Sequence, residues 1–471
     1  MGQLNRLGKD ILEIGLHSDV KEERILQFGE GNFLRAFVDY FVDLLNEKKL
    51  FNGSIVVVQP IKQGLVDQLN TQDGLYTVIL RGFEDNQPIV KKRLITSVSR
   101  GINPYDNFKD YLALAKVSSF RYVVSNTTEA GIAFLETDKL TDKPPTSFPA
   151  KLTLLLYERF KHFKGDNSKG FIFIPCELID NSGDRLKETI LQYAESWKLE
   201  KGFADWINIA NHFTNTLVDR IVTGYPKDEA EAISKEQGYE DKLLVAAEIF
   251  NFFAIEAKGE AARELTETLP IATITDDVTP YKKRKVRILN GAHTMSVLAA
   301  YLYGIRTVGE MMDNPLFVEY LKKGMFKEIL PTLDVEEAES FAYSVLDRFA
   351  NPYIKHYLQS IALNSVAKFR ARVLPSIIDY YDMKAELPEI LTLSFAALIE
   401  FYKGNNHKVE DDIEIVEFFQ AGHSVQEICT REDYWGLNLN SLSGFCEKVT
   451  LYLDEIDKHG IEDVIKKAVS P

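Results

Sequence analysis

Residues 25–35 read ILQFGEGNFLR, and this stretch decides the fold. Its first four residues form a short, mostly apolar run of the kind found in buried strands, and the glycine-rich break after it ends the run. From Phe33 to Leu45 the apolar residues recur at helical spacing, up to a second break at Asn52 and Gly53. The β-branched run at 55–58 that follows is typical of a buried strand, so the sequence predicts one strand–helix–strand unit.

Further apolar runs at 122–124 and 171–174 alternate with stretches of helical character. Such alternation is typical of a parallel sheet that helices cover on both faces. From Gly291 onward helical periodicity dominates, and a chain of 471 residues exceeds what one core normally supports. We therefore predict an α/β fold: a Rossmann-like, doubly wound sheet domain over residues 1–279, followed by a mainly α-helical domain over residues 280–471.

The composition argues against several classes of function. The formal net charge is -15, with 70 acidic and 55 basic residues, whereas a nucleic-acid-binding surface needs clustered Lys and Arg. The three cysteines, Cys176, Cys429 and Cys446, are too few and too scattered for a disulfide framework, which favours a reducing compartment. The N-terminal residues lack the apolar stretch of a signal peptide, and no apolar run is long enough to span a bilayer. We predict a cytoplasmic protein without a nucleic-acid or membrane partner.

Residues 29–31, GEG, follow the first predicted strand and open the helix, which is the setting of a dinucleotide-binding turn. The first glycine permits the tight turn, and the second lets backbone N–H groups approach a pyrophosphate. Leu34 stands where the GxGxxG pattern has its third glycine, so the turn could also be an ordinary connection. Arg35 could reach a phosphate or pair with an acidic neighbour. The candidate cofactor-binding residues of this segment are Gly29, Gly31, Asn32, Phe33 and Arg35.

Two further segments are expected to face the cofactor. The residue after the second strand normally reads the ribose, and here it is Gln59, while Lys62 nearby leaves NADP open beside NAD. Residues 125–129, SNTTE, end another predicted strand, at the edge of the sheet where ligands bind. Their side chains could contact the nicotinamide ribose or amide, or could cap the next helix. The candidates in these segments are Gln59, Ser125, Asn126, Thr128 and Glu129.

Residues 285–293, KVRILNGAH, bring a lysine, an asparagine and a histidine close together in sequence. If a helix starts near Asn290, His293 lies one turn further on the same side, and Lys285 sits in a strand-like segment leading in. Reduction of a carbonyl by hydride needs a proton donor for the developing alkoxide and hydrogen bonds to its oxygen. A lysine whose pKa is lowered by burial or neighbouring cations could be that donor. The spacing alone also fits a structural histidine beside a solvated basic run.

Lys285, Asn290 and His293 resemble the K-x4-N-x2-H signature of the polyol-specific long-chain dehydrogenase/reductase family, also called the mannitol dehydrogenase family. The turn at 29–35 is similar to the family's GxGxFxR variant, which lacks the third glycine. Three more segments resemble family motifs in the same order: TEAG at 128–131, LVDRI at 217–221 and RFANP at 348–352. The resemblance covers about residues 20–375, and the string around Lys285 is most similar to a branch that acts on sugar acids.

The resemblance implies that Lys285 is the general acid/base and that Asn290 and His293 orient the carbonyl or hydroxyl oxygen. It implies NAD as the cofactor and a reaction without a metal ion. Asp219 would lie at the substrate pocket, unless it pairs with Arg220 or another base. These implied roles describe an enzyme, an NAD-dependent dehydrogenase or reductase that acts on CH–OH groups.

Two departures from the family pattern bear on the substrate. Mannitol-type members carry an asparagine where this chain has Leu178, and an arginine eight residues before a lysine where it has Ser360 before Lys368. Both departures disfavour a mannitol- or fructuronate-type substrate. Lys368, Arg370 and Arg372 instead offer cations for a sugar-acid carboxylate, and Lys368 is the favoured one. The candidate substrate-binding residues are Asp219, Lys368, His356 and Asn364.

The sequence therefore predicts an oxidoreductase that moves a hydride between NAD(H) and one carbonyl carbon of an open-chain sugar acid, its small-molecule partner. Residues 1–279 would bind the cofactor, and residues 280–471 would bind the substrate and carry the catalytic groups. Two alternatives stay open. One is another sugar-acid or polyol dehydrogenase of the same family, and the other is a non-catalytic NAD-binding regulatory protein.

Overall fold

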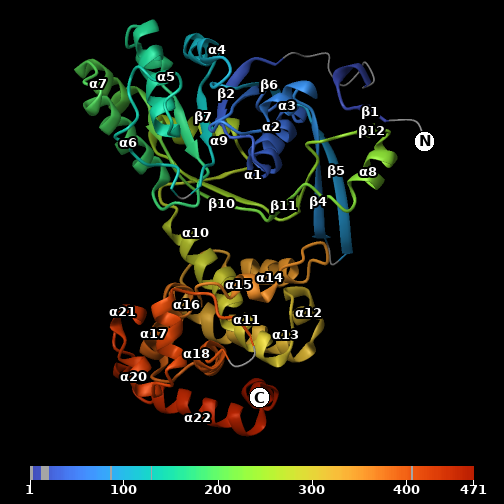
Figure 1. The fold of residues 1–471 in the computed structure, drawn as a ribbon, viewed down its shortest axis with the longest axis vertical. Helices are drawn as coiled ribbons and strands as arrows, with labels where there is room; N and C mark the ends of the chain where they lie inside the picture. The colour runs from blue at the N-terminus through green and yellow to red at the C-terminus, as the bar shows by residue number, and fades with distance from the viewer. Residues whose placement is uncertain (1–3, 12–20, 85–86, 129, 405–406, 471) are drawn as a thin grey trace. The chain divides into compact units, whose positions relative to one another are not determined.

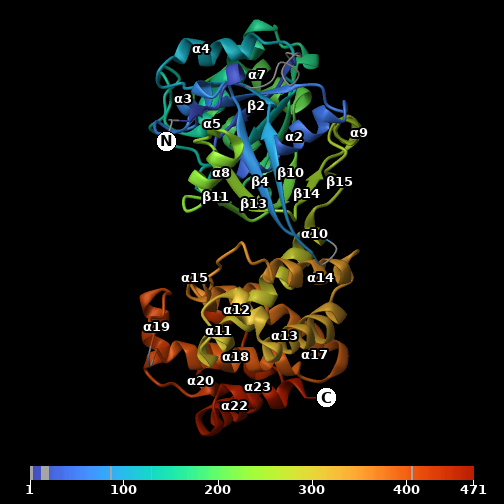
Figure 2. The same cartoon turned by 90° about the vertical axis from the view of Figure 1, so that its right-hand side faces the viewer.

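The computed structural model describes residues 4–11, 21–84, 87–128, 130–404 and 407–470. The chain divides into two compact units, residues 1–278 and residues 279–471, and each is described by itself (Figures 1 and 2).

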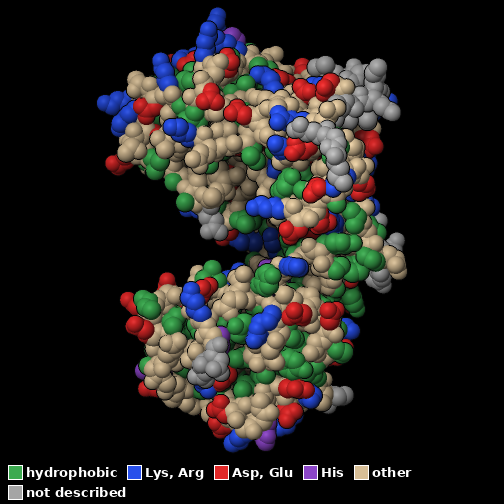
Figure 3. All heavy atoms as spheres, turned by 45° about the vertical axis from the view of Figure 1, so that its right-hand side comes forward, with side chains coloured by type: hydrophobic (Ala, Val, Ile, Leu, Met, Phe, Trp, Pro, Cys, Tyr) green, Lys and Arg blue, Asp and Glu red, His purple; other side chains and the backbone are tan. Residues whose placement is uncertain are grey.

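Although acidic residues outnumber basic ones, both kinds are found on the surface. Figure 3 shows Lys and Arg side chains mixed with Asp and Glu side chains over the face that it presents.

The main sheet of the first unit is parallel and has the strand order β6-β3-β2-β7-β8-β9. Its strands are β2 (Glu23–Phe28), β3 (Ser54–Val58), β6 (Val98–Ile102), β7 (Tyr122–Ser125), β8 (Ile172–Pro175) and β9 (His212–Phe213). From β2 the chain proceeds outward on one side through β3 and β6, and then on the other side through β7, β8 and β9. The carboxyl ends of β2, β3 and β7 therefore surround the switch point at which doubly wound sheets bind ligands.

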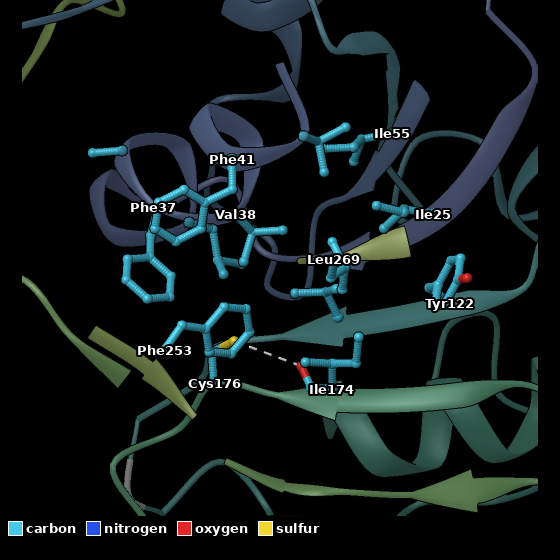
Figure 4. Close-up of a cluster of buried hydrophobic side chains, with 14 of the residues drawn as sticks. Ile25, Phe37, Val38, Phe41, Ile55, Tyr122, Ile174, Cys176, Phe253 and Leu269 are labelled. Atoms are coloured by element: carbon cyan, nitrogen blue, oxygen red, sulfur yellow. Dashed lines mark hydrogen bonds between the residues drawn. The ribbon is translucent and has the colours of Figure 1, made fainter. Parts of the chain in front are cut away.

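Alternate residues of the main sheet face two separate cores, as the period of a strand requires. Ile25 of β2 lies in one core, and its neighbour Leu26 lies in the other. In the first core the rings of Phe37, Phe41 and Phe253 gather, with centroids 4.7 Å apart for Phe37 and Phe41 and 5.1 Å apart for Phe37 and Phe253 (Figure 4). The helices of this core are α2 (Val38–Glu47), α3 (Val66–Thr71) and α9 (Gly259–Thr268), and Leu34 and Ala36 of the short helix before α2 also belong to it. Those of the other core are α4 (Phe108–Ala113), α5 (Phe148–His162), α6 (Ser182–Ser196) and α7 (Lys201–Ala210).

The first unit also contains strands that the alternating strand–helix pattern did not predict. A mixed sheet has the order β11-β13-β4-β5, another has the order β10-β14-β15, and β1 pairs with β12. These strands are β1 (Asn5–Arg6), β4 (Tyr76–Glu84), β5 (Gln87–Ile95), β10 (Asn215–Asp219), β11 (Val222–Gly224), β12 (Tyr239–Glu240), β13 (Val245–Glu248), β14 (Phe252–Glu256) and β15 (Thr273–Thr275). The remaining helices of this unit are α1 (Asn32–Ala36) and α8 (Ala230–Gln237), with short 3-10 turns at η1 (Lys9–Ile11), η2 (Leu114–Lys116) and η3 (Asn167–Lys169).

In its described residues, the second unit is mainly helical. Its helix α18 (Glu389–Tyr402) is apolar around most of its circumference and packs against α11 and α22, as helices of this kind do in a core (Figure 2). The other helices are α10 (Thr279–Arg284), α11 (Gly291–Tyr303), α12 (Val308–Asp313), α13 (Pro315–Lys322), α14 (Ala338–Phe349), α15 (Leu358–Ile361), α16 (Ser365–Arg372), α17 (Leu374–Lys384), α19 (Ile413–Gln420), α20 (Val425–Cys429), α21 (Glu432–Trp435), α22 (Phe445–His459) and α23 (Ile461–Val469). Two π-helical turns, η4 (Lys285–Asn290) and η5 (Lys323–Ile329), and the 3-10 turns η6 (Leu330–Thr332) and η7 (Leu439–Ser441) complete the unit.

Two of the three cysteines are joined, which their spacing in the sequence did not predict. Cys429 ends α20 and Cys446 lies in the first turn of α22, and the two form a disulfide with their Cα atoms 6.8 Å apart. Packing between these helices brings together residues that are 17 positions apart in sequence. Cys176 is buried at the end of β8. None of the described helices combines the length and the hydrophobicity that crossing a membrane requires.

The predicted fold class is confirmed. The first unit contains the doubly wound parallel sheet with helices on both faces, and the second is a helical domain. The strand order outward from β2 is that of the Rossmann fold, in which the first strand lies at the centre.

Candidate functional site

The turn after β2 has a backbone conformation that depends on glycine. Gly29 has a φ of +126°, a region in which L side chains are strained, and its N–H donates a hydrogen bond of 3.1 Å to the carbonyl oxygen of Val58. Gly31 is the N-cap of α1, and a Cβ atom added there would meet no atom within 4 Å. The turn is therefore tight at its first glycine and open to a ligand at its second.

A cavity of about 430 Å³ lies beside this turn. Its walls come from residues 29–31, 60–61, 126–135 and 146–148, although residue 129 itself is not among the described residues. The first three of these segments follow β2, β3 and β7, so the cavity lies at the switch point of the parallel sheet. Its position and size suit the nucleotide part of a dinucleotide.

The structure brings several of the candidate cofactor residues to this cavity. Those that line it are Gly29, Gly31, Asn126 and Thr128. Ser125 is buried at the end of β7, and Glu129 lies outside the described residues. Contact between these residues and a cofactor stays a prediction.

Arg35, Asn32 and Phe33 shape the turn from its protein side. The buried Arg35 donates from Nε to the carbonyl oxygen of Glu30 at 3.1 Å and from Nη2 to Oδ1 of Asn32 at 2.7 Å. Phe33 stacks on Phe37 with ring centroids 4.8 Å apart. Burial is the largest influence on the Arg35 guanidinium and lowers its pKa. These contacts hold the glycine turn against the first core.

Gln59 follows β3 as predicted, but its side chain turns into the protein. Its Nε2 donates to the carbonyl oxygens of Ile61 and Lys62 at 3.0 and 3.1 Å, and its Oε1 accepts from the N–H of Val66 at 3.4 Å. The amide is therefore engaged in holding the loop between β3 and α3. The Lys62 side chain is exposed, and Lys62 does not line the cavity.

Two buried carboxylates, which are not among the residues predicted from the sequence, lie beside the cavity. Oε1 of Glu30 accepts from the N–H of Leu65 at 3.2 Å, and Oε1 of Glu177, which follows β8, accepts from the N–H of Thr127 at 3.1 Å. The Oε2 atom of each is buried and has no hydrogen-bond partner among the described residues. Burial raises the pKa of Glu30 and raises that of Glu177 to about 6. An acid between two turn glycines, and another just after a parallel strand, were the signals that could have identified them.

The three residues of the dehydrogenase signature lie on one continuous helical stretch. Helix α10 passes into the π-helical turn η4, which holds Lys285 and Asn290, and then into α11, which holds His293. Residues five apart point about 140° away from each other on an α-helix, whereas a π-helix bonds residue i to residue i+5 and brings them together. The π turn therefore places Lys285 and Asn290 on one side, and His293 follows three residues later on the same side. The predicted strand-like segment at Lys285 is wrong, because the helix already begins at Thr279.

The His293 side chain is buried and packs against two other rings. Its ring stacks on Phe349 with centroids 4.1 Å apart and meets the ring of His356 edge-on at 5.3 Å. Within the described part of the chain, its Nε2 has no hydrogen-bond partner. Burial holds the pKa of His293 well below its ordinary value, and four neighbours lower it further: His356, Arg348, Arg372 and Lys368. A buried polar atom without a partner calls for an explanation, and a bound ligand is one.

Lys368 and Arg372 stand one turn apart on α16, beside this histidine. Nζ of Lys368 donates to the carbonyl oxygen of Ile361 at 2.9 Å, and Nη1 of Arg372 donates to Oγ1 of Thr294 at 3.4 Å. Burial lowers the pKa of both cations, and the charge of Arg372 lowers that of Lys368 further. Because an anion between these groups would relieve their repulsion and replace lost hydration, the cluster favours a negatively charged ligand.

The other candidate substrate residues are spread over both units. His356 belongs to the group around His293, whereas Asn364 is an exposed N-cap of α16 with a φ of +53°. Arg370 is exposed and donates to the carbonyl oxygen of Asp433 at 3.2 Å. Asp219 is buried at the end of β10 in the first unit. Its neighbour Arg220 donates to three backbone carbonyl oxygens, those of Ala36, Ile249 and Phe250.

No group of three or more His, Cys, Asp or Glu side chains that could hold a metal ion is found within the residues that the structure describes.

The first unit has a cavity at the switch point of a parallel sheet. The helical unit carries a lysine, an asparagine and a histidine whose Nε2 has no partner among the described residues. Together these features define a dinucleotide-dependent dehydrogenase. The sequence matches the family model of the mannitol dehydrogenase Rossmann domain over residues 23–267 and that of the mannitol dehydrogenase C-terminal domain over residues 277–457. The chain belongs to the mannitol dehydrogenase family.

Relatives of known name extend this result over nearly the whole chain. The protein is 43% identical over 479 residues to an altronate oxidoreductase of Bacillus subtilis (strain 168), and 98% of each chain is covered. It is 46% identical over 464 residues to an altronate oxidoreductase of Yersinia pestis, with 94% of this chain and 96% of the relative covered.

Solved structures share the fold at lower sequence identity. A D-sorbitol dehydrogenase in substrate-free form has a TM-score of 0.80 at 19% identity, over 94% of this chain and 95% of its own. A Pseudomonas fluorescens mannitol 2-dehydrogenase, in a ternary complex with NAD and D-mannitol, has a TM-score of 0.66 at 23% identity, over 95% of this chain and 94% of its own. At these identities the likeness concerns the fold alone.

Proposed function

We propose that this protein interconverts D-tagaturonate and D-altronate by moving a hydride between NAD(H) and the ketone carbon of the sugar acid. Similarity to altronate oxidoreductases over nearly the whole chain supports this substrate. The structural observation that carries the proposal is the unpartnered Nε2 of His293, which lies beside the cations Lys368 and Arg372. Both sugar acids have a carboxylate for these cations to hold, whereas an uncharged polyol or ketose has none.

The residues of the second unit have different roles in binding and reducing the substrate. Lys368 and Arg372 hold the carboxylate and so fix one end of the open chain. His293 is neutral at physiological pH because its pKa is depressed, and its Nε2 hydrogen-bonds the oxygen on the reacting carbon, together with the amide of Asn290. Lys285 gives a proton to that oxygen as the carbonyl becomes a hydroxyl, and it takes the proton back when altronate is oxidised.

The residues of the first unit fit a dinucleotide. The space above Gly31 admits a group close to the backbone, and Asn126 and Thr128 offer hydrogen-bonding groups along the cavity. When bound, NADH supplies the hydride for reduction, and NAD+ accepts it in the reverse direction. We therefore assign residues 1–279 as the NAD-binding domain and residues 280–471 as the substrate and catalytic domain of a cytoplasmic enzyme. The reaction requires the Lys285 amine and the nicotinamide to reach the same carbonyl group.

Oxidation of NADH by the purified enzyme with different ketones tests the substrate. Tagaturonate, fructuronate and fructose are supplied at equal concentrations, and kcat/KM is measured for each. We expect the largest value for tagaturonate. A larger value for fructuronate would make the protein a fructuronate reductase, and a larger value for the uncharged fructose would reject a sugar-acid substrate. Tight NADH binding without turnover of any of the three would favour a non-catalytic NAD-binding protein.

A further inference from the structure

Glu30 stands between the two glycines of the cofactor turn and lines the cavity. It is 7% exposed, and its carboxylate reaches across to the loop after β3, where Oε1 accepts the N–H of Leu65 at 3.2 Å. Its Oε2 is buried without a hydrogen-bond partner among the described residues. A buried acceptor with no partner is costly in a folded protein, so this oxygen calls for a ligand that would satisfy it.

The loop to which Glu30 is tied is the one that normally receives the adenosine ribose in doubly wound sheets, through an acid at the end of the second strand. This chain has no acid between residues 58 and 66, and the amide of Gln59 is engaged with Ile61, Lys62 and Val66. The acidic residue that usually binds the ribose is therefore absent from the end of β3. Glu30 supplies a carboxylate to the same corner of the cavity from the neighbouring turn.

The ionisable side chains that line the cavity also favour NAD(H) over NADP(H). Among the described residues that line it, Glu30 is the only ionisable one, and neither a lysine nor an arginine is present to pair with a phosphate. NADP(H) differs from NAD(H) by a phosphate on the 2′-oxygen of that ribose. A phosphate next to this buried carboxylate is disfavoured, because the two negative charges repel each other and burial weakens their screening by water.

We infer that Glu30 makes this enzyme select NAD(H) over NADP(H), because its carboxylate repels a 2′-phosphate and its unpartnered oxygen accepts a hydrogen bond from the ribose. This inference rests on the proposed function only in taking the cavity as the dinucleotide site. The charge must be present for the selection to operate. Burial raises the pKa of Glu30, while the N–H of Leu65 and the nearby Arg35 oppose that rise, so the test is made at about pH 8, well above the ordinary pKa of a glutamate.

The test measures the binding of each cofactor to the full-length protein without any sugar substrate. Dissociation constants of NADH and NADPH are obtained by titration of cofactor fluorescence for the wild type and for Glu30→Gln, which has the same shape without the charge. The wild type is expected to bind NADH roughly 100-fold or more tightly than NADPH, and Glu30→Gln is expected to reduce this ratio at least about tenfold. Because no sugar is present, a failure of the tagaturonate assay would leave this result untouched.

Two further variants separate charge from structure. Glu30→Asp keeps the charge and shortens the side chain, so the preference for NADH should persist even if both affinities fall. Asp67→Asn removes an exposed carboxylate that does not line the cavity, in the first turn of α3, and should leave the ratio unchanged. An unchanged NADH/NADPH ratio in Glu30→Gln, or a wild type that prefers NADPH, would overturn the inference.

Discussion

Lys368→Met removes one of the two cations that we assign to the substrate carboxylate and keeps a long apolar side chain in its place. Lys368 is half-buried beside Arg372, and its Nζ already donates one hydrogen bond, of 2.9 Å, to the carbonyl oxygen of Ile361. An ammonium group has two further protons to donate. The proposal uses these for the carboxylate of tagaturonate, so the substitution should weaken the sugar acid selectively.

The expected loss has two parts of different size. Losing the bond to Ile361 costs about 1 kcal/mol of folding free energy, which does not depend on the substrate. Losing a charge-assisted hydrogen bond to the substrate costs about 1.5–3 kcal/mol, which is roughly a 10- to 150-fold fall in kcat/KM for tagaturonate. Fructose has no carboxylate, and its kcat/KM should therefore change little.

The assay compares kcat/KM for tagaturonate and fructose in the wild type, Lys368→Met and a matched control. Arg370 lies two residues further on α16, is exposed, and contacts the carbonyl oxygen of Asp433, so Arg370→Met removes a similar charge from the same helix. We expect the control to keep the wild-type ratio between the two substrates. Equal losses for tagaturonate and fructose in Lys368→Met would refute the reasoning, because the lysine would then act through structure alone.

Three other predictions follow from the geometry. Gly29→Ala places a Cβ atom at a φ of +126° and 3.3 Å from Cδ1 of Leu34. The substitution should lower the free energy of unfolding, measured by denaturant titration, by about 1–3 kcal/mol and should weaken NADH binding. An affinity for NADH equal to that of the wild type would contradict a role of this turn in the site. The pKa of His293 is depressed in the folded state, so as the pH falls the histidine is protonated first in the unfolded state. The free energy of unfolding should therefore decrease below about pH 6.5, by up to about 1.4 kcal/mol per pH unit. His293→Gln should show a smaller decrease between pH 7.5 and 5.5, and identical pH profiles would count against the buried neutral imidazole. Dialysis against a chelator should leave tagaturonate reduction unchanged, and activity restored by added zinc would contradict a metal-independent reaction.

The first strand and its turn could be predicted because their cause is local. Ile25 and Leu26 face opposite cores of a sheet buried on both sides, so an almost continuous apolar run was the right signal. The break at residues 29–31 follows from the φ of +126° that Gly29 adopts, which other residues rarely adopt. The helical character of the second unit, to which α18 belongs, was predictable from the helical periodicity beyond Gly291.

The π-helical turn could not be predicted from the sequence. Lys285 and Asn290 are five residues apart, a spacing that would separate them on an α-helix. With a helix predicted to start near Asn290, Lys285 was expected in a strand-like segment before it. A π turn depends on how the flanking helices pack and leaves no apolar period of its own. The pair of Cys429 and Cys446 was missed for a similar reason, because its partners meet through the packing of α20 against α22.

The candidate site differs from its prediction mainly in which side chains could hydrogen-bond a ligand. Gln59 was expected to face the ribose, yet its amide is engaged by its own loop, and only the hydrogen bonds of the folded chain reveal this. Glu30 belongs to the glycine motif, but only its burial and the Oε2 atom, which has no partner among the described residues, make its carboxylate a candidate. Arg348 was likewise part of a motif, and the structure places its charge close enough to His293 to lower the pKa of the imidazole.

Lys285→Ala tests the central claim, that this lysine transfers the proton during reduction of the sugar acid. We expect kcat for tagaturonate to fall by about 10²- to 10⁴-fold, the usual contribution of a general acid, because no other group is assigned to donate the proton. Lys283→Ala, which changes an exposed lysine of α10 two residues earlier, is the matched control and should keep wild-type activity.

The decisive measurement is kcat for tagaturonate beside the dissociation constant of NADH, in the same preparations of wild type, Lys285→Ala and Lys283→Ala. The account predicts that Lys285→Ala loses turnover while it binds NADH as tightly as the wild type. Turnover that survives the loss of this amine, or a loss that Lys283→Ala shares, would contradict it.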